Sequence, residues 1–518
     1  MGLRSALFGA HRSGQPAVRA AREPVLHRRT SRGLTGRGGG RWGAIPQPPG
    51  WYASSTQLCG IYPFGAGSFR PDIGTPLGRD LEVGTAVAGD METWYHQGLI
   101  SSPSMMLFGL NGNGKSSFAQ RLAYGMNSRG IAPAVFDPIK NEHAAMVDAL
   151  GGTVVSIGPR SAFRLNPMDR GALGEAAERV GGLLGEDIRR DATERVLDLI
   201  ELLVRVNRGG ALTDIEAATL RLMTESVLRR FDTPIYADLI AAFDSPPPEV
   251  VAGVNRRTPE EFTHDFRSLS DAVRSVAIGE MGYLVGGKES VRLPVGNPGG
   301  FCFDTSSIRQ SQTRLLSAAM LATWHIGFST IDAHWELSQY DPEVPWGGYL
   351  AIQDEFWFPM RAVPGIVDLA DRVGRTNRGL GVSELKITHT PKDFLSLPNP
   401  EDREKARGFA QRSGVLGLMA LSRDDLYELS DKVIALNGRE VDAVAGFNQP
   451  PGWKPRLRAD GTPEPPPGAG KILIKLPGRV GIPIKMTLTE TEKRLHVTDE
   501  RSHRRPSHRA ADEAEARS

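Results

Sequence analysis

The sequence has few cysteines and no long apolar run. Its two cysteines, Cys59 and Cys302, are far apart and match no metal-ligand spacing, which argues against a disulfide framework and favours a reducing compartment. No window approaches the roughly 18 consecutive apolar residues of a transmembrane helix. The most apolar stretch, RLLSAAMLATWHIGF, is too short and contains His325. We therefore expect a chain without a membrane span.

Net charge is also low. The 62 basic and 60 acidic side chains give a formal net charge of +2, which excludes a uniformly basic nucleic-acid coat and confines any nucleic-acid contact to a local patch. At 518 residues, the chain exceeds what a single core supports. We therefore expect one large domain with an insertion and two tails.

Both ends lack the periodic apolar pattern of packed elements. Residues 1–50 hold nine arginines and one acid, Glu23, a composition typical of a disordered basic arm. An organelle transit peptide is the alternative, although the arm lacks the regular apolar face that such a helix needs. We predict a second disordered tail over residues 500–518.

Between the tails, short apolar runs alternate with helical periodicity. The run MMLFG predicts a buried strand, and the segment after it carries Phe118, Leu122 and Met126 at helical spacing. APAVFDP and GTVVSIG predict two more strands, with a helix over about 142–150 between them. This alternation predicts a parallel sheet. GFCFDTSSI, GGYLAIQDEF, VSELKITHT, VLGLMALS and KILIKLP continue the strands, and a long buried helix is predicted over 310–332.

Strand signals vanish over residues 171–286, where amphipathic helices follow one another. TDIE from Thr213 and TPEE from Thr258 both match capping boxes, the second with proline at the favoured first helical position. We therefore predict an all-helical insertion over 171–286, between two parts of one core domain at 51–170 and 287–499.

A glycine-rich stretch, LFGLNGNGKSS, carries the spacing of a phosphate-binding loop. Its glycines let successive N–H groups point at phosphate oxygens, and the following helix adds the positive end of its dipole. Lys115 is expected to reach the β- and γ-phosphates, and Ser116 to ligate Mg²⁺. An ordinary glycine-rich turn is the alternative, but the predicted strand before the loop and helix after it favour nucleotide binding. The predicted nucleotide-binding residues are Gly109, Asn111, Gly112, Asn113, Gly114, Lys115, Ser116 and Ser117.

The run YLAIQDEFW places two acids at the end of another predicted buried strand. Asp354 is expected to hold Mg²⁺, and Glu355 to polarise the attacking water. Gln353 interrupts the apolar run and, by strand alternation, faces away from Asp354. A solvated acidic pair after a strand is the alternative. The nucleotide-site hypothesis requires that these acids and Lys115 lie within reach of one ligand.

Several segments resemble the VirB-type conjugation ATPases of type IV secretion systems, within the FtsK and HerA superfamily of P-loop motors. DEFWFPM, GRTNRGLGV, ITHTPKDF and KILIKLPGRVGIPIKMTLTETE resemble later family segments, and the similarity spans about residues 75–499. The resemblance implies an α/β fold, namely a RecA-like P-loop NTPase with a central, mostly parallel sheet and an all-helical insertion. Earlier matching positions are Asp137, Glu142, Gly151, Gly152, Asn166 and Pro167.

The chain departs from the family pattern at two places. Where the family carries a glutamine that senses the γ-phosphate, this chain has His389, which would donate the same hydrogen bond in one tautomer. A histidine that closes the strand by bonding to backbone is the alternative. Many relatives also carry a large N-terminal domain that sits on the secretion channel. Its absence here implies recruitment to the membrane by a separate subunit.

The resemblance further implies a ring in which an arginine of one subunit completes the neighbour's site. The candidates lie in the helix predicted after the metal-binding strand, where Arg375 and Arg378 occupy the end that would reach outward and Arg372 lies further in. Such cations would equally complement the helix dipole or pair with Asp368 or Asp371.

Taken together, the resemblance implies a hexameric motor that hydrolyses ATP with Mg²⁺ and energises a conjugative type IV secretion system. Its implied partners are copies of itself and other secretion subunits at the membrane, and its implied location is the cytoplasm, including the inner face of the cell membrane. A DNA pump or coupling protein, with DNA as its partner, and a nucleotide-gated scaffold with little turnover are the alternatives. The expected catalytic residues are Glu355, Lys115, Arg375, Arg378 and His389.

Overall fold

The computed structural model describes most of the chain between residues 71 and 495. The described ranges are 71–137, 141–159, 161, 164–361, 367, 380–395, 397, 399–448 and 466–495. Two short strands near the N-terminus, β1 (Arg29–Thr30) and β2 (Gly33–Leu34), pair antiparallel within a separate unit, Met1–Gly67. The rest of the predicted arm 1–50 and the predicted tail 500–518 lie outside the described residues. All other elements belong to the unit Ser68–Ser518.

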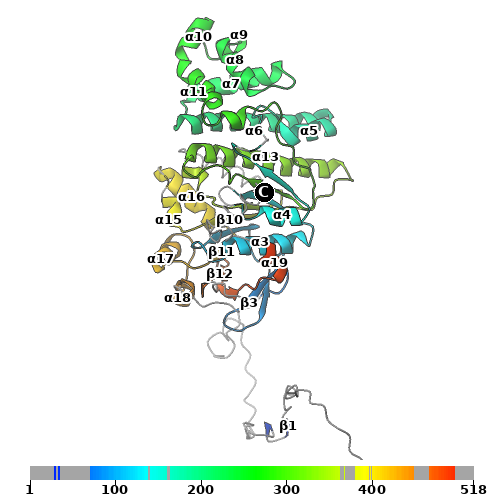
Figure 1. Ribbon diagram of the computed structural model, residues 1–518, viewed down its shortest axis with the longest axis vertical. Helices are drawn as coiled ribbons and strands as arrows, with labels where there is room; N and C mark the ends of the chain where they lie inside the picture. The colour runs from blue at the N-terminus through cyan, green and yellow to red at the C-terminus, as the bar shows by residue number, and fades with distance from the viewer. Residues whose placement is uncertain are drawn as a thin grey trace, which may run out of the picture. The chain divides into compact units, whose positions relative to one another are not determined.

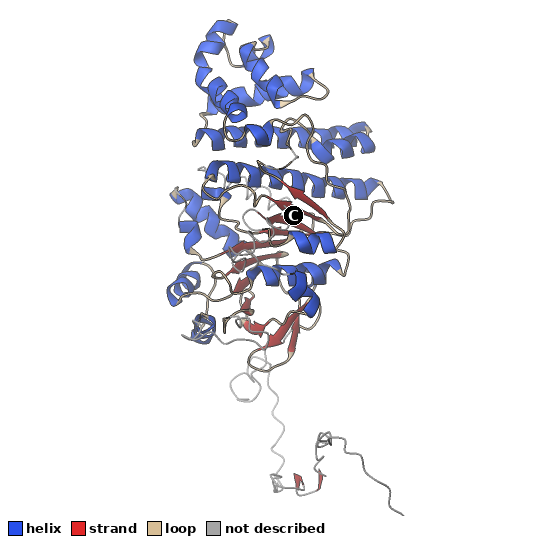
Figure 2. Ribbon diagram, in the orientation of Figure 1, coloured by secondary structure: helices blue, strands red, loops and turns tan. Residues whose placement is uncertain are grey.

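An eleven-stranded sheet forms the centre of this second unit (Figure 2). Its strands are β3 (Pro76–Asp80), β4 (Ala86–Ala88), β5 (Ser104–Phe108), β6 (Ala132–Asp137), β7 (Thr153–Ser156), β8 (Phe301–Asp304), β9 (Tyr349–Gln353), β10 (Ser383–Thr388), β11 (Val415–Leu418), β12 (Lys471–Lys475) and β13 (Ile482–Lys485). They lie in the order β4-β3-β13-β12-β11-β5-β10-β9-β6-β8-β7. From β11 to β7 all neighbours are parallel, as the alternation of strands and helices predicts. The strands β12, β13, β3 and β4 add to one side antiparallel.

Both faces of the sheet are covered, which is why its strands are apolar in unbroken runs. Successive side chains of β5 alternate between two hydrophobic cores, because strand side chains point to opposite faces. Met105 and Leu107 pack in the core that includes α3 (Lys115–Asn127). Met106 and Phe108 pack in the core that includes α13 (Thr313–Tyr340).

Helix α13 is longer than predicted and starts and ends later than the predicted span 310–332. It is buried along most of its length, because the sheet lies on one side of it and two further helices lie on the other (Figure 1). These two are α5 (Gly171–Val180) and α6 (Gly182–Arg208). The chain between β7 and β8 continues with α7 (Asp214–Arg230), α8 (Tyr236–Asp244), α9 (Pro248–Gly253), α10 (Pro259–Asp265), α11 (Arg267–Ile278) and α12 (Gly282–Val285).

Helix starts in this region follow the local sequence. The capping box predicted at Thr213 is present, because its side chain accepts from the backbone N–H of Glu216 while the Glu216 side chain accepts in return. The box predicted at Thr258 is only half formed: the Thr258 side chain caps α10, but the Glu261 carboxylate accepts from the N–H of Arg257 instead. One cap bond is enough to start the helix.

The remaining helices complete the layers around the sheet. They are α2 (Met91–His96), α4 (Ala144–Ala149), the 3₁₀ turn η1 (Pro359–Arg361), α15 (Lys392–Leu395), α16 (Pro400–Arg412), α17 (Arg423–Lys432), α18 (Gly438–Phe447) and α19 (Glu490–Leu495). The helix predicted from PGIVDLADRVGRTNRG lies outside the described residues except for Val367. None of the described helices combines the length and the apolar character needed to cross a bilayer.

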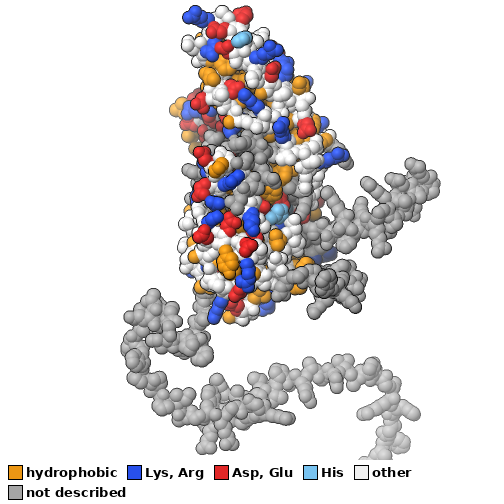
Figure 3. All heavy atoms as spheres, turned by 90° about the vertical axis from the view of Figure 1, so that its left-hand side faces the viewer, with side chains coloured by type: hydrophobic (Ala, Val, Ile, Leu, Met, Phe, Trp, Pro, Cys, Tyr) orange, Lys and Arg blue, Asp and Glu red, His pale blue; other side chains and the backbone are white. Residues whose placement is uncertain are grey.

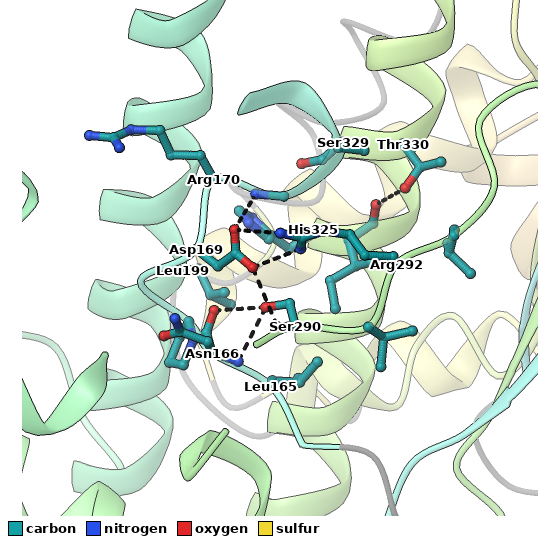
Figure 4. Close-up of a pocket in the computed structure, with 16 residues that line it drawn as sticks. Leu165, Asn166, Asp169, Arg170, Leu199, Ser290, Arg292, His325, Ser329 and Thr330 are labelled. Atoms are coloured by element: carbon teal, nitrogen blue, oxygen red, sulfur yellow. Dashed lines mark hydrogen bonds and ion pairs between the residues drawn. The ribbon is translucent and has the colours of Figure 1, made fainter. Parts of the chain in front are cut away.

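The chain enters and leaves the helical region side by side (Figure 4). Nδ2 of Asn166 donates to the carbonyls of Pro234, at 2.8 Å, and Lys288, at 3.2 Å. The Ser290 hydroxyl donates to the Asn166 carbonyl at 2.9 Å. Next to them, Arg292 Nη1 and Asp169 Oδ2 form an ion pair at 2.7 Å. These contacts clasp the two crossings together around a pocket with about 20 Å³ of free space, enough for about one water molecule.

Asp169 is the acidic member of this clasp, and its ionisation stabilises the junction. Burial opposes the charge, but hydrogen bonds from Arg292 and from the backbone of Gly171 and Ser290 outweigh it and lower the pKa of Asp169 below 3.8. A carboxyl group with a lowered folded-state pKa stabilises the fold above its unfolded-state pKa. This contribution is lost as the pH falls through the folded-state pKa.

We expect Asp169→Asn to lower the free energy of unfolding at pH 7 by about 1 kcal/mol, since Arg292 is partly exposed and solvent screens the pair. Urea unfolding of wild type and variant should converge below about pH 4. Glu175→Gln, which changes the exposed second partner of Arg292, is the matched control and should have little effect. A difference that persists unchanged at low pH would contradict this assignment.

Candidate nucleotide-binding site

The predicted phosphate loop joins the end of β5 to the start of α3. Gly112 and Gly114 have φ angles of 78° and 97°, in the left-handed region that glycine adopts without steric cost. The N–H of Gly109 donates to the carbonyl of His389 at 3.0 Å, which ties the loop to the end of β10. The loop therefore opens at the N-terminus of α3, where the first-turn backbone N–H groups and the helix dipole favour an anion.

Lys115 is the first residue of α3, and its buried side chain folds back over the loop. Its Nζ donates to the Gly109 carbonyl at 2.7 Å and lies 3.4 Å from Oδ1 of Asn111. It also lies 3.1 Å from Nδ1 of His389. An ammonium group has donors only, so Nδ1 accepts and the imidazole proton sits on Nε2.

The same imidazole reaches the predicted water-polarising acid. Nε2 of His389 lies 3.0 Å from Oε1 of Glu355, so the ring bridges Lys115 and Glu355. The backbone N–H of His389 donates to Oδ2 of Asp393 at 3.0 Å. Both ring nitrogens thus face side chains, and the alternative of a histidine bonded to backbone does not describe this ring.

Glu355 is held in an unusual backbone conformation. Its φ is 48°, and among the described residues other than glycine only Asn255 also has a positive φ. Its second carboxylate oxygen, Oε2, accepts from Nε1 of Trp357 at 2.8 Å. Such a conformation costs on the order of 1–3 kcal/mol and concentrates at functional sites, where the surroundings enforce it. Two side-chain donors and the turn after β9 hold this carboxylate in place.

Asp354 is buried beside Glu355 and faces His143, with Oδ2 3.8 Å from Nε2. Burial raises the pKa of Asp354, but the nearby His143 imidazole, the charge of Lys115 and the backbone N–H of Glu355 outweigh it. The pKa of Asp354 therefore lies below its ordinary value, and the group is a carboxylate at neutral pH. Asp354 and Glu355 are both buried. The alternative of a solvated acidic pair therefore does not describe them.

The strands that carry the loop and the acids are not neighbours, because β10 lies between β5 and β9. His389, the residue after β10, spans the gap and brings Lys115 and Glu355 within one side chain of each other. Gln353 closes β9 as a buried residue. The requirement that the two segments lie within reach of one ligand is met without adjacency of their strands.

The oxygen ligands suit Mg²⁺. This ion is usually bound by one or two carboxylates together with nucleotide phosphates and water. Ser116, in the first turn of α3, and ionised Asp354 supply a hydroxyl and a carboxylate, so the donor set fits. The described residues contain no cluster of three or more His, Cys, Asp or Glu side chains suited to hold a metal by themselves.

Other predicted residues are placed only in part. Arg372, Arg375 and Arg378 lie outside the described residues, and Asp137 is described only as the last residue of β6. Sequence inspection missed His143 and Trp357. Trp357 adjoins the acidic pair, whereas no sequence signal connects His143 to Asp354, 211 positions further along the chain.

Comparison with known proteins gives a fold. No family model and no curated protein sequence matches the chain. The solved structure of VirB4 of Thermoanaerobacter pseudethanolicus matches with a TM-score of 0.55 and 18% identity, over 82% of this chain and 100% of that chain. This chain shares its fold with VirB4. This likeness confirms the predicted fold class, a RecA-like α/β P-loop fold with a mostly parallel sheet. It also confirms that the chain resembles the VirB-type ATPases in fold.

Two other solved structures are more distant. The conjugative coupling protein TrwB, solved in complex with ADP and Mg²⁺, matches with a TM-score of 0.43 and 14% identity over 76% of this chain and 88% of that chain. The cytoplasmic domain of the type VII secretion ATPase EccC of Thermomonospora curvata matches with a TM-score of 0.31 and 13% identity, over 83% of this chain and 32% of that chain.

Glycine at position 114 is required by both its φ and its surroundings. A Cβ there would lie 3.3 Å from the backbone nitrogen of Gly470, whereas a Cβ at Gly84, with φ 72°, would meet nothing within 4 Å. We expect Gly114→Ala and Gly84→Ala each to lower the free energy of unfolding by about 1 kcal/mol, because alanine is strained at a positive φ. Gly114→Ala should lose further stability through the contact with Gly470, and should also bind nucleotide more weakly. Urea unfolding and titration with a non-hydrolysable ATP analogue check this. Equal losses in both variants, or unimpaired binding by Gly114→Ala, would contradict it.

Proposed function

We propose that this protein is an ATP-hydrolysing motor that energises a conjugative type IV secretion system and works as a hexamer. One observation carries the proposal: the imidazole of His389 connects Lys115 of the phosphate loop, at 3.1 Å, with Glu355, at 3.0 Å. These groups lie at the edge of the sheet where the parallel strands end, the place where α/β folds bind ligands. The VirB4 fold supports the same assignment.

In the proposed reaction the loop N–H groups and Lys115 bind the phosphates of ATP, and Ser116 and Asp354 hold Mg²⁺. Bound Mg²⁺ would neutralise charge that develops on the phosphates. Glu355 orients and polarises the attacking water. Each oxygen of the Glu355 carboxylate keeps a second lone pair, so the carboxylate can accept a hydrogen bond from water. His389 and Trp357 keep the carboxylate oriented at the same time.

We further propose that residues 51–170 and 287–499 form the motor domain and that residues 171–286 form an insertion that moves with it. Helix α13 lies between the sheet and helices α5 and α6, so a shift of the sheet reaches the insertion through this helix. Arg375 or Arg378 would complete the site of the neighbouring subunit. The proposed partners are copies of this chain and membrane-bound secretion subunits, which place the motor at the inner face of the membrane.

DNA pumping by the same motor is a second candidate. The charge balance of +2 argues against a surface wrapped by DNA, and Figure 3 shows acidic and basic side chains interspersed over one face of the molecule. A ring needs basic residues only in its pore, however. ATP turnover measured with and without single- or double-stranded DNA separates the candidates, because a DNA-independent rate favours the channel motor.

We expect Glu355→Gln to lower kcat by about 10²- to 10⁴-fold, since general-base catalysis contributes an effect of this size. The affinity for a non-hydrolysable ATP analogue should change little, because Glu355 acts on water. Steady-state phosphate release and analogue titration measure the two quantities. Glu343→Gln, at an exposed position, is the control. Negligible turnover in wild type would instead favour a nucleotide-gated scaffold.

We expect His389→Gln to retain most of the turnover, because an amide can accept from Lys115 and donate to Glu355 at the same time. His389→Ala removes both contacts and should lower kcat by about tenfold or more, given about 1.5–3 kcal/mol for a hydrogen bond to a charged group. Parallel kcat and KM measurements check the order wild type, Gln, Ala. Equal rates for the glutamine and alanine variants would show that the bridge has no role.

A further inference from the structure

Two lysines face each other at the end of the antiparallel part of the sheet. Lys471 opens β12 and Lys485 closes β13, and the register pairs them directly. Like charges in this position repel each other. Burial, followed by the charge of Lys471, lowers the pKa of Lys485. The arrangement is unfavourable in the absence of a counter-charge.

Other lysines in the same sheet do have counter-charges. Lys475, at the opposite end of β12, lies 2.8 Å from the carboxylate of Glu440, and Lys386 on β10 pairs with Glu384. Within the described ranges, neither Lys471 nor Lys485 forms an ion pair with a carboxylate, and Nζ of Lys485 donates to the carbonyl of Ala469. The interior lysines are neutralised within the chain, and the pair at the edge is not.

Strand register places this pair at the edge that carries the phosphate loop. Leu418 on β11 lies opposite both Phe108, the last residue of β5, and Leu473 on β12. Because β12 runs antiparallel to β11, its first residue lies beyond Leu473 on the side where β5 ends. Lys471 and its partner Lys485 therefore lie outside the carboxyl ends of the parallel strands.

A short turn connects the pair to the loop itself. The N–H of Gly470 donates to the carbonyl of Asn113 at 2.9 Å. Nζ of Lys485 lies 3.7 Å from the position that a Cβ on Gly470 would take, and the nitrogen of Gly470 lies 3.3 Å from the position of a Cβ on Gly114. A single glycine thus separates the Lys485 ammonium group from the phosphate loop.

We propose that Lys471 and Lys485 form a second cationic wall of the nucleotide site and contact the phosphate chain of a bound nucleoside di- or triphosphate. This inference rests on the proposed function, which places the phosphates on the loop at Lys115. A polyphosphate supplies the negative charge that the chain itself does not supply here. Ammonium groups suit it, because they bind phosphate as point charges. The lysine pair is the counterpart of a ligand rather than of another side chain.

The test uses the full chain with Lys471→Gln, Lys485→Gln and the double change. Binding of ADP, of a non-hydrolysable ATP analogue and of pyrophosphate is measured by calorimetry, together with thermal unfolding without ligand. We expect each single change to weaken nucleotide binding about tenfold, as for loss of a charge-assisted hydrogen bond, and the double change to weaken it further. The ligand-free double variant should unfold at the same or a higher temperature, because repulsion is relieved.

Two further variants make the outcome decisive. Lys432→Gln changes a partly exposed lysine that pairs with Glu428 and should bind normally, whereas Lys115→Ala should lose binding. If the double variant binds as wild type while Lys115→Ala does not, this inference fails and the proposed function stands. If wild type binds no nucleotide, both fail.

Two outcomes would give Lys471 and Lys485 a different role. Loss of affinity for a single-stranded oligonucleotide, with nucleotide affinity intact, would overturn the inference and assign the pair to nucleic-acid phosphates. Weaker nucleotide binding that occurs only together with a lowered unfolding temperature would also overturn it, because the pair would then have a structural role.

Discussion

The alignment of three parallel strands is the constraint on which the candidate site depends. The register sets Phe108 of β5 beside Thr388 of β10, and Lys386 of β10 beside Gln353 of β9. The residues that follow the three strands therefore emerge at one edge, at nearly the same level. A single imidazole is long enough to join the loop after β5 to the acids after β9 only because of this alignment. A shift of one strand by one residue would turn its side chains to the opposite face.

The sequence predicted the central strands well, because strands covered on both faces are unbroken apolar runs, as in MMLFG and YLAIQ. It predicted the loop from its glycines and lysine, and the acids from their place after a buried strand. Strand order was not predictable, since apolar runs do not specify which neighbour they pair with. The short strands β3 and β4, PLGRD and AVA, lie within residues 51–98, where the Gly, Pro and aromatic content predicts short strands and turns. The bridge that His389 forms between Lys115 and Glu355 could not be predicted either, because it depends on β10 lying between β5 and β9.

Charged groups in this fold follow a simple division. In the interior, Lys386 pairs with Glu384 and Lys475 with Glu440, as burial of an ion requires a partner. At the carboxyl edge of the sheet the cations lie close to one another or to neutral acceptors: Lys115 bonds to a carbonyl and to an imidazole, and Lys485 to a carbonyl. Lys115, Lys471 and Lys485 therefore lie at the same edge of the sheet as the acids Asp354 and Glu355.

The clasp between Asn166 and Ser290 has a structural consequence for the rest of the chain. Because the two crossings into the helical region are bonded to each other at 2.9 Å, the chain leaves and rejoins the sheet at one place, while α5 and α6 pack against α13. Helices α7 to α12, beyond the pair that packs on α13, can lengthen or shorten during divergence without altering the spacing of β7 and β8, whose register is set by their own ladder. The helices can thus diversify while the sheet edge that holds the candidate site keeps its geometry.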